Sequence, residues 1–153
     1  MEGPGIRGWY PLSMSDPTLF TAFLYGSLSH RKIRDKDRGT LRGPLGDQED
    51  REALICETAT IRLLNEVTSD PSRAVTDAVI LSVLCMAANS HQGVALTPPA
   101  QSPFYPPLRS LQWLDVYGAL SANPVHVQGL ARLIELRGGL GNVTLPGLAA
   151  IIS

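Results

Sequence analysis

The sequence has little cysteine and no long apolar run, which excludes several common classes of protein. Its 153 residues include two cysteines, Cys56 and Cys85. Two are too few for a disulfide framework or for a four-cysteine zinc site. Because both lie within apolar helical patterns, we expect buried free thiols. No apolar run reaches the roughly 18 residues that a membrane-spanning helix needs, so we expect no membrane association.

An excess of one charge is also lacking. The chain has 13 Lys and Arg against 14 Asp and Glu, a formal net charge of −1. Since no overall positive field would draw it onto a phosphate backbone, we expect no direct DNA binding by this chain alone. Residues 1–10 lack the basic and apolar regions of a secretory signal. The sequence therefore favours a reducing compartment, the cytosol or the nucleus.

Motifs of the common catalytic and metal sites are missing as well. His30, His91 and His126 lie far apart, and none has a second ligand at metal-binding spacing. There is no GxSxG nucleophile elbow. The glycine-rich stretch 138–141 follows a helical pattern, whereas a phosphate loop follows a strand and opens a helix. We predict no catalytic residue, no metal site and no cofactor.

The most strongly specified segment is a helix predicted over 126–139. Asn123 suits its N-cap, and Pro124 suits the first turn, where a missing N–H costs nothing. Its apolar residues recur with helical spacing. They are Val127, Leu130, Ala131 and Ile134, widened by Leu133 and Leu136. Gly138 stands where a left-handed C-terminal cap is wanted, and Gly139 lets the chain leave at a sharp angle.

Further helices are predicted on both sides of a central one. Asp16 and Pro17 open a helix over 16–30, and another runs over 47–69 until Asp70-Pro71 ends it. The predicted buried face of the first is Phe20, Phe23, Leu24 and Leu28. The apolar positions of the second are Leu54, Cys56, Ala59, Ile61, Leu63, Leu64 and Val67. Thr76 suits the N-cap of a helix over 76–89 that is apolar nearly all round, which predicts the core helix. A fourth helix is expected over 108–120.

Two loops are expected between these helices. The first, 31–47, holds six basic residues interleaved with Asp35 and Asp37. It is interpreted either as a solvated loop or as a nuclear-localisation or phosphate-binding patch. The second, 91–107, carries five prolines and should be exposed and partly extended. Thr97 and Ser102 each precede a proline there and are candidates for phosphorylation.

These elements predict an all-α fold, an irregular bundle of five or six helices in which 126–139 packs against 76–89. Residues 1–15 should form an irregular N-terminal arm, and 16–153 a single helical domain. The last segment, 145–153, is typical of the first turns of a buried helix. It is interpreted either as a short docked plug or, as we expect, as a sign that the chain is a fragment of a larger helical domain.

Four stretches resemble the fungal-specific transcription factor domain. This is the helical regulatory region C-terminal to a binuclear zinc-cluster DNA-binding module. The stretches are SMSDPTLFTAFLYGS, ETATIRLLNE, DPSRAVTDAVILSVLCMAAN and HVQGLARLIELRGGL. The positions that carry the resemblance are Asp16, Pro17, Thr76, Asp77, His126, Gly129, Arg137, Gly138 and Gly139. The six-cysteine zinc cluster of such regulators is missing here.

The resemblance implies a non-enzymatic regulatory role in the nucleus, in which the chain binds a protein partner or a small effector. It also implies that the motif positions are structural. The resemblance also permits a degenerate or partial protein that has no independent activity. The alternative is a small-molecule enzyme or ligand-binding protein with a pocket between helices, in which His126 or His91 would act as base.

Overall fold

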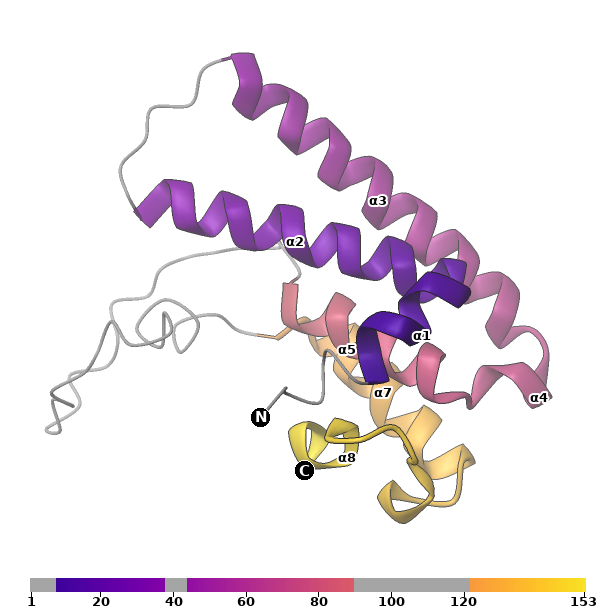
Figure 1. Ribbon diagram of the computed structural model, residues 1–153. Helices are drawn as coiled ribbons and strands as arrows, with labels where there is room; N and C mark the ends of the chain where they lie inside the picture. The colour runs from indigo at the N-terminus through magenta and orange to yellow at the C-terminus, as the bar shows by residue number, and fades with distance from the viewer. Residues whose placement is uncertain (1–7, 38–43, 90–121) are drawn as a thin grey trace, which may run out of the picture.

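The computed structural model describes residues 8–37, 44–89 and 122–153, and these residues form helices joined by short turns, with no strand (Figure 1). The elements are α1 (Tyr10–Ser15), α2 (Pro17–Asp37), α3 (Pro44–Thr68), α4 (Pro71–Ala74), α5 (Asp77–Asn89), α7 (Pro124–Leu136), the 3-10 turn η3 (Leu140–Asn142) and α8 (Leu148–Ile152). The predicted all-α fold is confirmed. The described residues contain seven α-helices where five or six were expected, because α1 and α4 add short ones.

Some predictions fall outside the described residues. They concern the loop 91–107 with His91, Thr97 and Ser102, the helix 108–120, residues 1–7 of the N-terminal arm and residues 38–43 of the loop 31–47. Among the described helices, none combines the length and the apolar character that crossing a membrane requires.

The two long helices, α2 and α3, lie side by side as an antiparallel pair (Figure 1). Near their linked ends, Arg31 pairs with Glu49 at 2.7 Å and Lys32 pairs with Asp50 at 3.0 Å. The prediction of a loop over 31–47 is therefore wrong for 31–37 and 44–47, because α2 continues to Asp37 and α3 begins at Pro44, while 38–43 lie outside the described residues. Two basic residues of the predicted loop, Arg31 and Lys32, instead pair with acids of the neighbouring helix.

The predicted irregular arm over 1–15 is also partly wrong, because its last six residues form α1. Trp9 and Leu12 pack against the core, and Ser13 is buried. Tyr10 and Met14 are exposed. A proline in the first turn and a hydrogen bond from the Asp16 N–H to the Leu12 carbonyl support this short helix.

The buried face of α2 differs from the predicted one. Phe20 and Leu24 are 42% and 41% exposed, whereas Leu19, Ala22 and Tyr25 are completely buried. α2 packs against both α3 and α5, so its buried arc is wide. This arc includes the large side chains of Leu19 and Tyr25 as well as Ala22, and Phe20 and Leu24 fall outside it.

The apolar positions predicted for α3 are partly correct. Leu64 and Val67 are buried, whereas Leu54 and Ile61 are 61% and 39% exposed. The buried residues of this helix are Ala53, Thr60, Leu64 and Val67. The Thr60 hydroxyl donates to the carbonyl of Cys56, which satisfies its polar group inside the contact.

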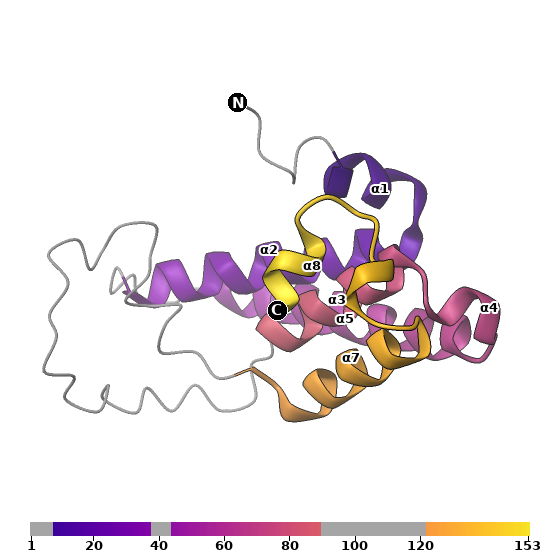
Figure 2. The ribbon, with the colours of Figure 1, turned by 90° about the horizontal axis from the view of Figure 1, so that it is seen from below.

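Helix α5 is the core helix, as predicted. Its buried residues are Ala78, Val79, Ile80, Leu81, Ser82, Val83, Met86 and Ala87. It packs against α2 and against α7, and the expected contact between 126–139 and 76–89 is therefore confirmed (Figure 2). Thr76 Oγ1 accepts a hydrogen bond from the N–H of Val79 at 3.4 Å, which confirms Thr76 as the N-cap.

The C-terminal segment returns to the core beside α1 (Figure 2). Leu148, at the start of α8, is completely buried in the main hydrophobic cluster. The indole N–H of Trp9 donates to the carbonyl of Pro146 at 2.9 Å. α8 thus docks through Leu148 and, at its far end, through the partly buried Ile152, while Ile151 stays exposed.

Candidate functional site

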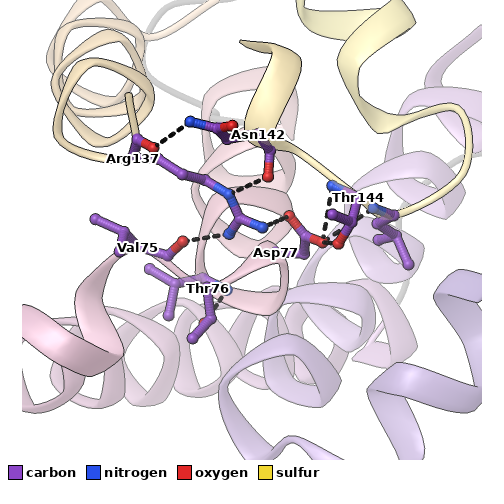
Figure 3. A network of polar contacts seen from close by, with 8 residues as sticks. Val75, Thr76, Asp77, Arg137, Asn142 and Thr144 are labelled. Atoms are coloured by element: carbon purple, nitrogen blue, oxygen red, sulfur yellow. Dashed lines mark hydrogen bonds and ion pairs between the residues drawn. The ribbon is translucent and has the colours of Figure 1, made fainter. Parts of the chain in front are cut away.

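The candidate site lies where α7 ends and α5 begins (Figure 3). There Arg137 Nη2 lies 2.9 Å from Asp77 Oδ1, and the two side chains are only 16% and 14% exposed. The other nitrogens of the same guanidinium donate to backbone carbonyls: Nε to that of Asn142 at 2.7 Å, and Nη1 to that of Val75. One arginine therefore holds three separate segments together.

The second carboxylate oxygen of Asp77 accepts hydrogen bonds from a further segment, residues 144–145. Asp77 Oδ2 accepts from the hydroxyl of Thr144 at 2.6 Å and from the backbone N–H groups of Thr144 and Leu145 at 3.2 and 2.9 Å. Asp77 is also the first residue of α5, where the helix dipole favours a negative charge. The carboxylate therefore fixes the residues after η3 onto the start of the core helix. We refer to Val75, Asp77, Arg137, Asn142 and Thr144 as the Asp77–Arg137 network.

The two glycines after α7 form the turn that directly follows Arg137. Gly138 and Gly139 have φ of 90° and 102°. The N–H of Gly139 donates to the carbonyl of Ile134 and that of Gly138 to the carbonyl of Glu135, both at 2.9 Å. This pair of bonds is a Schellman motif, and it confirms Gly138 as the left-handed cap.

Asn142 closes the same turn from the other side. Its side-chain Nδ2 donates to the carbonyls of Arg137 and Gly138 at 2.9 and 3.3 Å. A Cβ atom at position 138 would lie 2.7 Å from this Nδ2. Gly138 is therefore required both by its backbone angle and by the close approach of Asn142.

Five of the nine motif positions lie at this junction and four do not. Thr76, Asp77, Arg137, Gly138 and Gly139 are together. Asp16 and Pro17 instead start α2, where Asp16 Oδ1 accepts from the N–H of Leu19 at 2.9 Å and so confirms the predicted N-cap. The motif thus divides into one tertiary junction and separate helix positions.

His126 and Gly129 both lie on α7, outside the network. His126 is half-buried in the first turn, and burial lowers the pKa of its imidazole while the charge of Glu57 opposes the shift. A Cβ at Gly129 would meet nothing within 4 Å, so packing does not require a glycine there. Asn123 Oδ1 accepts from the N–H of Val125 at 2.9 Å, which confirms the N-cap of this helix.

The apolar stripe predicted for α7 is only partly correct. Leu130 and Leu133 are buried, whereas Val127 and Leu136 are 43% and 57% exposed. Ile134 is partly buried against the core and Ala131 is exposed, so the helix buries only part of the predicted stripe.

A separate feature is an open groove between α2 and α5 with a volume of about 420 Å³. It is lined by Phe23, Gly26, Ser27, His30, Cys85 and Asn89, and we call it the α2–α5 groove. The phenol O–H of Tyr25 donates to the Asn89 carbonyl at 2.9 Å, and Asn89 Nδ2 donates to the Cys85 carbonyl at 2.9 Å. These bonds set the position of the Asn89 side chain at the end of α5.

Both cysteines are free thiols, as predicted, and both are half-buried. Burial raises the pKa of Cys85 to about 12. Burial, and to a smaller extent the charge of Glu52, also raises the pKa of Cys56. At neutral pH both groups are protonated, and a thiol is a much weaker nucleophile than a thiolate.

Three residues of the network were not predicted from the sequence: Val75, Asn142 and Thr144. Val75 contributes only its carbonyl, which no side-chain pattern reveals. Asn142 and Thr144 are polar residues that alternate with apolar ones after the glycine pair, a weak signal that this turn folds back onto the domain. In the described part of the chain, no three His, Cys, Asp or Glu side chains are grouped as metal ligands would be.

Comparison with known protein families, curated proteins and solved structures finds no match. The resemblance to the fungal-specific transcription factor domain therefore stays a prediction from the motif residues.

Proposed function

We propose that this chain is a non-enzymatic regulatory module, of the kind that lies C-terminal to the zinc cluster in fungal transcription regulators. In this proposal it acts in the nucleus, binds a protein partner or a small effector, and leaves DNA contact to a separate module. One observation carries the proposal. Two groups of motif positions, Thr76-Asp77 and Arg137-Gly138-Gly139, meet in a single junction, in which Asp77 and Arg137 pair across 60 residues of sequence.

This convergence supports the resemblance because the motif positions come from the sequence pattern, whereas their meeting in space is an independent observation. Apolar stripes with helical spacing occur in many unrelated helical proteins, so they do not distinguish one family from another. An arginine, an aspartate and a capping glycine that fit one another across two helices are much more specific. Their role here is to fix the angle between α5, α7 and the C-terminal segment, which is what a rigid contact module requires.

The test is transcriptional. The full chain is fused to an unrelated DNA-binding domain and directed to a reporter promoter in yeast nuclei. The proposal expects a change in reporter expression of several-fold relative to the DNA-binding domain alone. An Arg137→Gln fusion, which breaks the network, should lose most of this effect. An Arg132→Gln fusion should keep it, because Arg132 forms an exposed pair with Glu135 on the same helix.

Fusion levels measured by immunoblot separate loss of activity from loss of protein. A well-expressed wild-type fusion that leaves the reporter unchanged at several promoters would overturn the proposal. Gel-shift titration of the chain without the fusion partner tests the claim that DNA contact is left to a separate module. Sequence-specific affinity for duplex DNA at low salt would show that this chain binds DNA by itself.

The second candidate function is a ligand-binding protein or small-molecule enzyme with a pocket between helices. Of these two, the α2–α5 groove favours the ligand-binding protein. Cys85 lines this groove, but with a pKa of about 12 it offers a neutral thiol and not a nucleophile. His126, the described residue predicted as base for this alternative, is not part of the groove lining, in which the histidine is His30. The groove therefore supports recognition of a small molecule more than a reaction on it.

A further inference from the structure

The lining of the α2–α5 groove has a distinct chemical character. None of the six described residues that line it is Asp, Glu, Lys or Arg. A ring, a thiol and a hydroxyl come from Phe23, Cys85 and Ser27. Among the six, His30 is the residue that can carry a positive charge, and it already has an interaction of its own. A charged ligand would therefore lose hydration here with little opposite charge to gain, which is costly, whereas a neutral apolar ligand would lose little. The lining therefore matches an uncharged molecule.

Asn89 supplies directional polarity at one end of the groove. Two hydrogen bonds hold this residue: its backbone carbonyl accepts from Tyr25 Oη, and its Nδ2 donates to the Cys85 carbonyl. With the amide nitrogen used in this way, Oδ1 remains the acceptor end of the group. A ligand that offers one hydrogen-bond donor would complement it.

Gly26 makes room for this amide. A Cβ at position 26 would lie 3.3 Å from Asn89 Nδ2 and 3.9 Å from Oδ1. A larger residue on α2 would therefore press on the amide. Glycine is unfavourable by about 1 kcal/mol in a helix interior, so its presence within α2 fits a need for close approach.

We propose that the α2–α5 groove binds a small neutral aromatic molecule that carries one hydrogen-bond donor, with its ring against Phe23 and its donor on Asn89 Oδ1. The volume of about 420 Å³ falls in the lower part of the range for small-molecule sites. The inference rests on the proposed function in its small-effector form and specifies the chemistry of that effector.

The test uses three probes that share one ring system: β-naphthol, which is neutral and has one donor, naphthalene, which has none, and β-naphthoate, which is an anion. Each is titrated into the full, isotope-labelled chain and followed by NMR. β-Naphthol should produce saturable shifts at the amides of Gly26, Ser27 and Asn89. It should bind at least fivefold more tightly than naphthalene, and β-naphthoate should bind more weakly than either.

Substitutions locate the binding. Ser27→Trp places an indole at the groove and should abolish the shifts, while Thr58→Trp, on the exposed face of α3, should leave them unchanged. Asn89→Ala should reduce the affinity for β-naphthol to that for naphthalene. Melting curves verify that each variant is folded, and the two tryptophan variants serve as matched controls for each other.

Three results would overturn the inference: no saturable binding of β-naphthol, shifts centred away from the groove, or equal binding by the Ser27→Trp and wild-type chains. These results are distinct from failure of the regulatory proposal. A chain that binds none of the probes but changes reporter expression would overturn the groove assignment alone. A chain that binds β-naphthol but leaves the reporter silent would overturn the regulatory role alone.

Discussion

Trp9 and Pro146 join the two ends of the described chain, because the indole N–H of one donates to the carbonyl of the other at 2.9 Å. Replacing the indole by a phenyl ring in Trp9→Phe keeps an aromatic contact and removes the donor. We expect a loss of about 1 kcal/mol in the free energy of unfolding. Faster amide exchange in α8 should accompany it. Tyr10→Phe is the control, because Tyr10 is 62% exposed, and it should change neither quantity.

Arg137 and Arg132 lie on the same stretch of chain and each pairs with an acid, but their burial differs. Arg137→Gln removes an ion pair whose side chains are 16% and 14% exposed, together with two bonds to carbonyls. We expect it to lower the free energy of unfolding by about 2–4 kcal/mol. Arg132→Gln affects a pair that is 68% and 67% exposed and should cost about 0.5 kcal/mol or less. Urea denaturation measures both, and equal losses would contradict the central role of the network.

Gly138→Ala tests the left-handed cap. Alanine at a φ of 90° is strained, and its Cβ would lie 2.7 Å from Asn142 Nδ2, so we expect a loss of about 1–2 kcal/mol. At Gly141, by contrast, a Cβ meets nothing within 4 Å, and Gly141→Ala should be close to neutral. Thermal melts of the two variants decide this. If the two melting temperatures agreed, the cap would not contribute as the hydrogen bonds indicate.

His126 should make folding stability depend on pH. Because burial lowers the pKa of this imidazole from its ordinary value of 6.5, the folded chain binds its proton less readily than the unfolded chain. Its contribution to stability is therefore present above about pH 6.5 and is lost as the pH falls below that value. Urea midpoints between about pH 7 and pH 5 should fall less in His126→Gln than in the wild type.

The charge of Glu57 opposes this shift, so Glu57→Gln should lower the pKa of His126 further. NMR titration of the imidazole measures this directly. A pKa that stays the same or rises in Glu57→Gln would show that Glu57 does not act on His126.

The two thiols should react slowly in the folded chain. Since burial raises the pKa of Cys85 to about 12 and also raises that of Cys56, little thiolate is present at mildly alkaline pH. With an aromatic disulfide reagent, Cys56 should react before Cys85, and unfolding in urea should make both fast. Cys85→Ser and Cys56→Ser assign the two phases. A fast phase that disappears in Cys85→Ser would contradict the burial of that thiol.

Features that depend on local sequence were largely predictable. The caps at Asp16, Thr76, Asn123 and Gly138 all involve atoms within a few residues, and each is confirmed by a hydrogen bond or backbone angle. The core position of α5 followed from a helix without a polar side. In these cases the neighbouring residues alone determine the outcome.

Features that depend on which helix lies alongside were not predictable. On α2 the buried face holds Leu19, Ala22 and Tyr25, while Phe20 and Leu24, which predicted another face, are exposed, because the two neighbouring helices decide which side is covered. The charges of Arg31 and Lys32 suggest a solvated loop in the sequence, because their partners on α3 cannot be recognised there. The Asp77–Arg137 pair joins positions 60 apart, and a single sequence carries no sign of such a pairing.

The position of Asp77 also sets an order of events during synthesis. The ribosome makes this carboxylate 67 residues before the Thr144 hydroxyl that donates to it. Helices α2 and α3 are close in sequence and can pair as soon as both have emerged, since local contacts form first. The first turn of α5 acquires its last donors only after residues 144 and 145 have been made. Until then a nascent chain carries a formed hairpin, while the start of its central helix lacks the donors that hold it in the native arrangement.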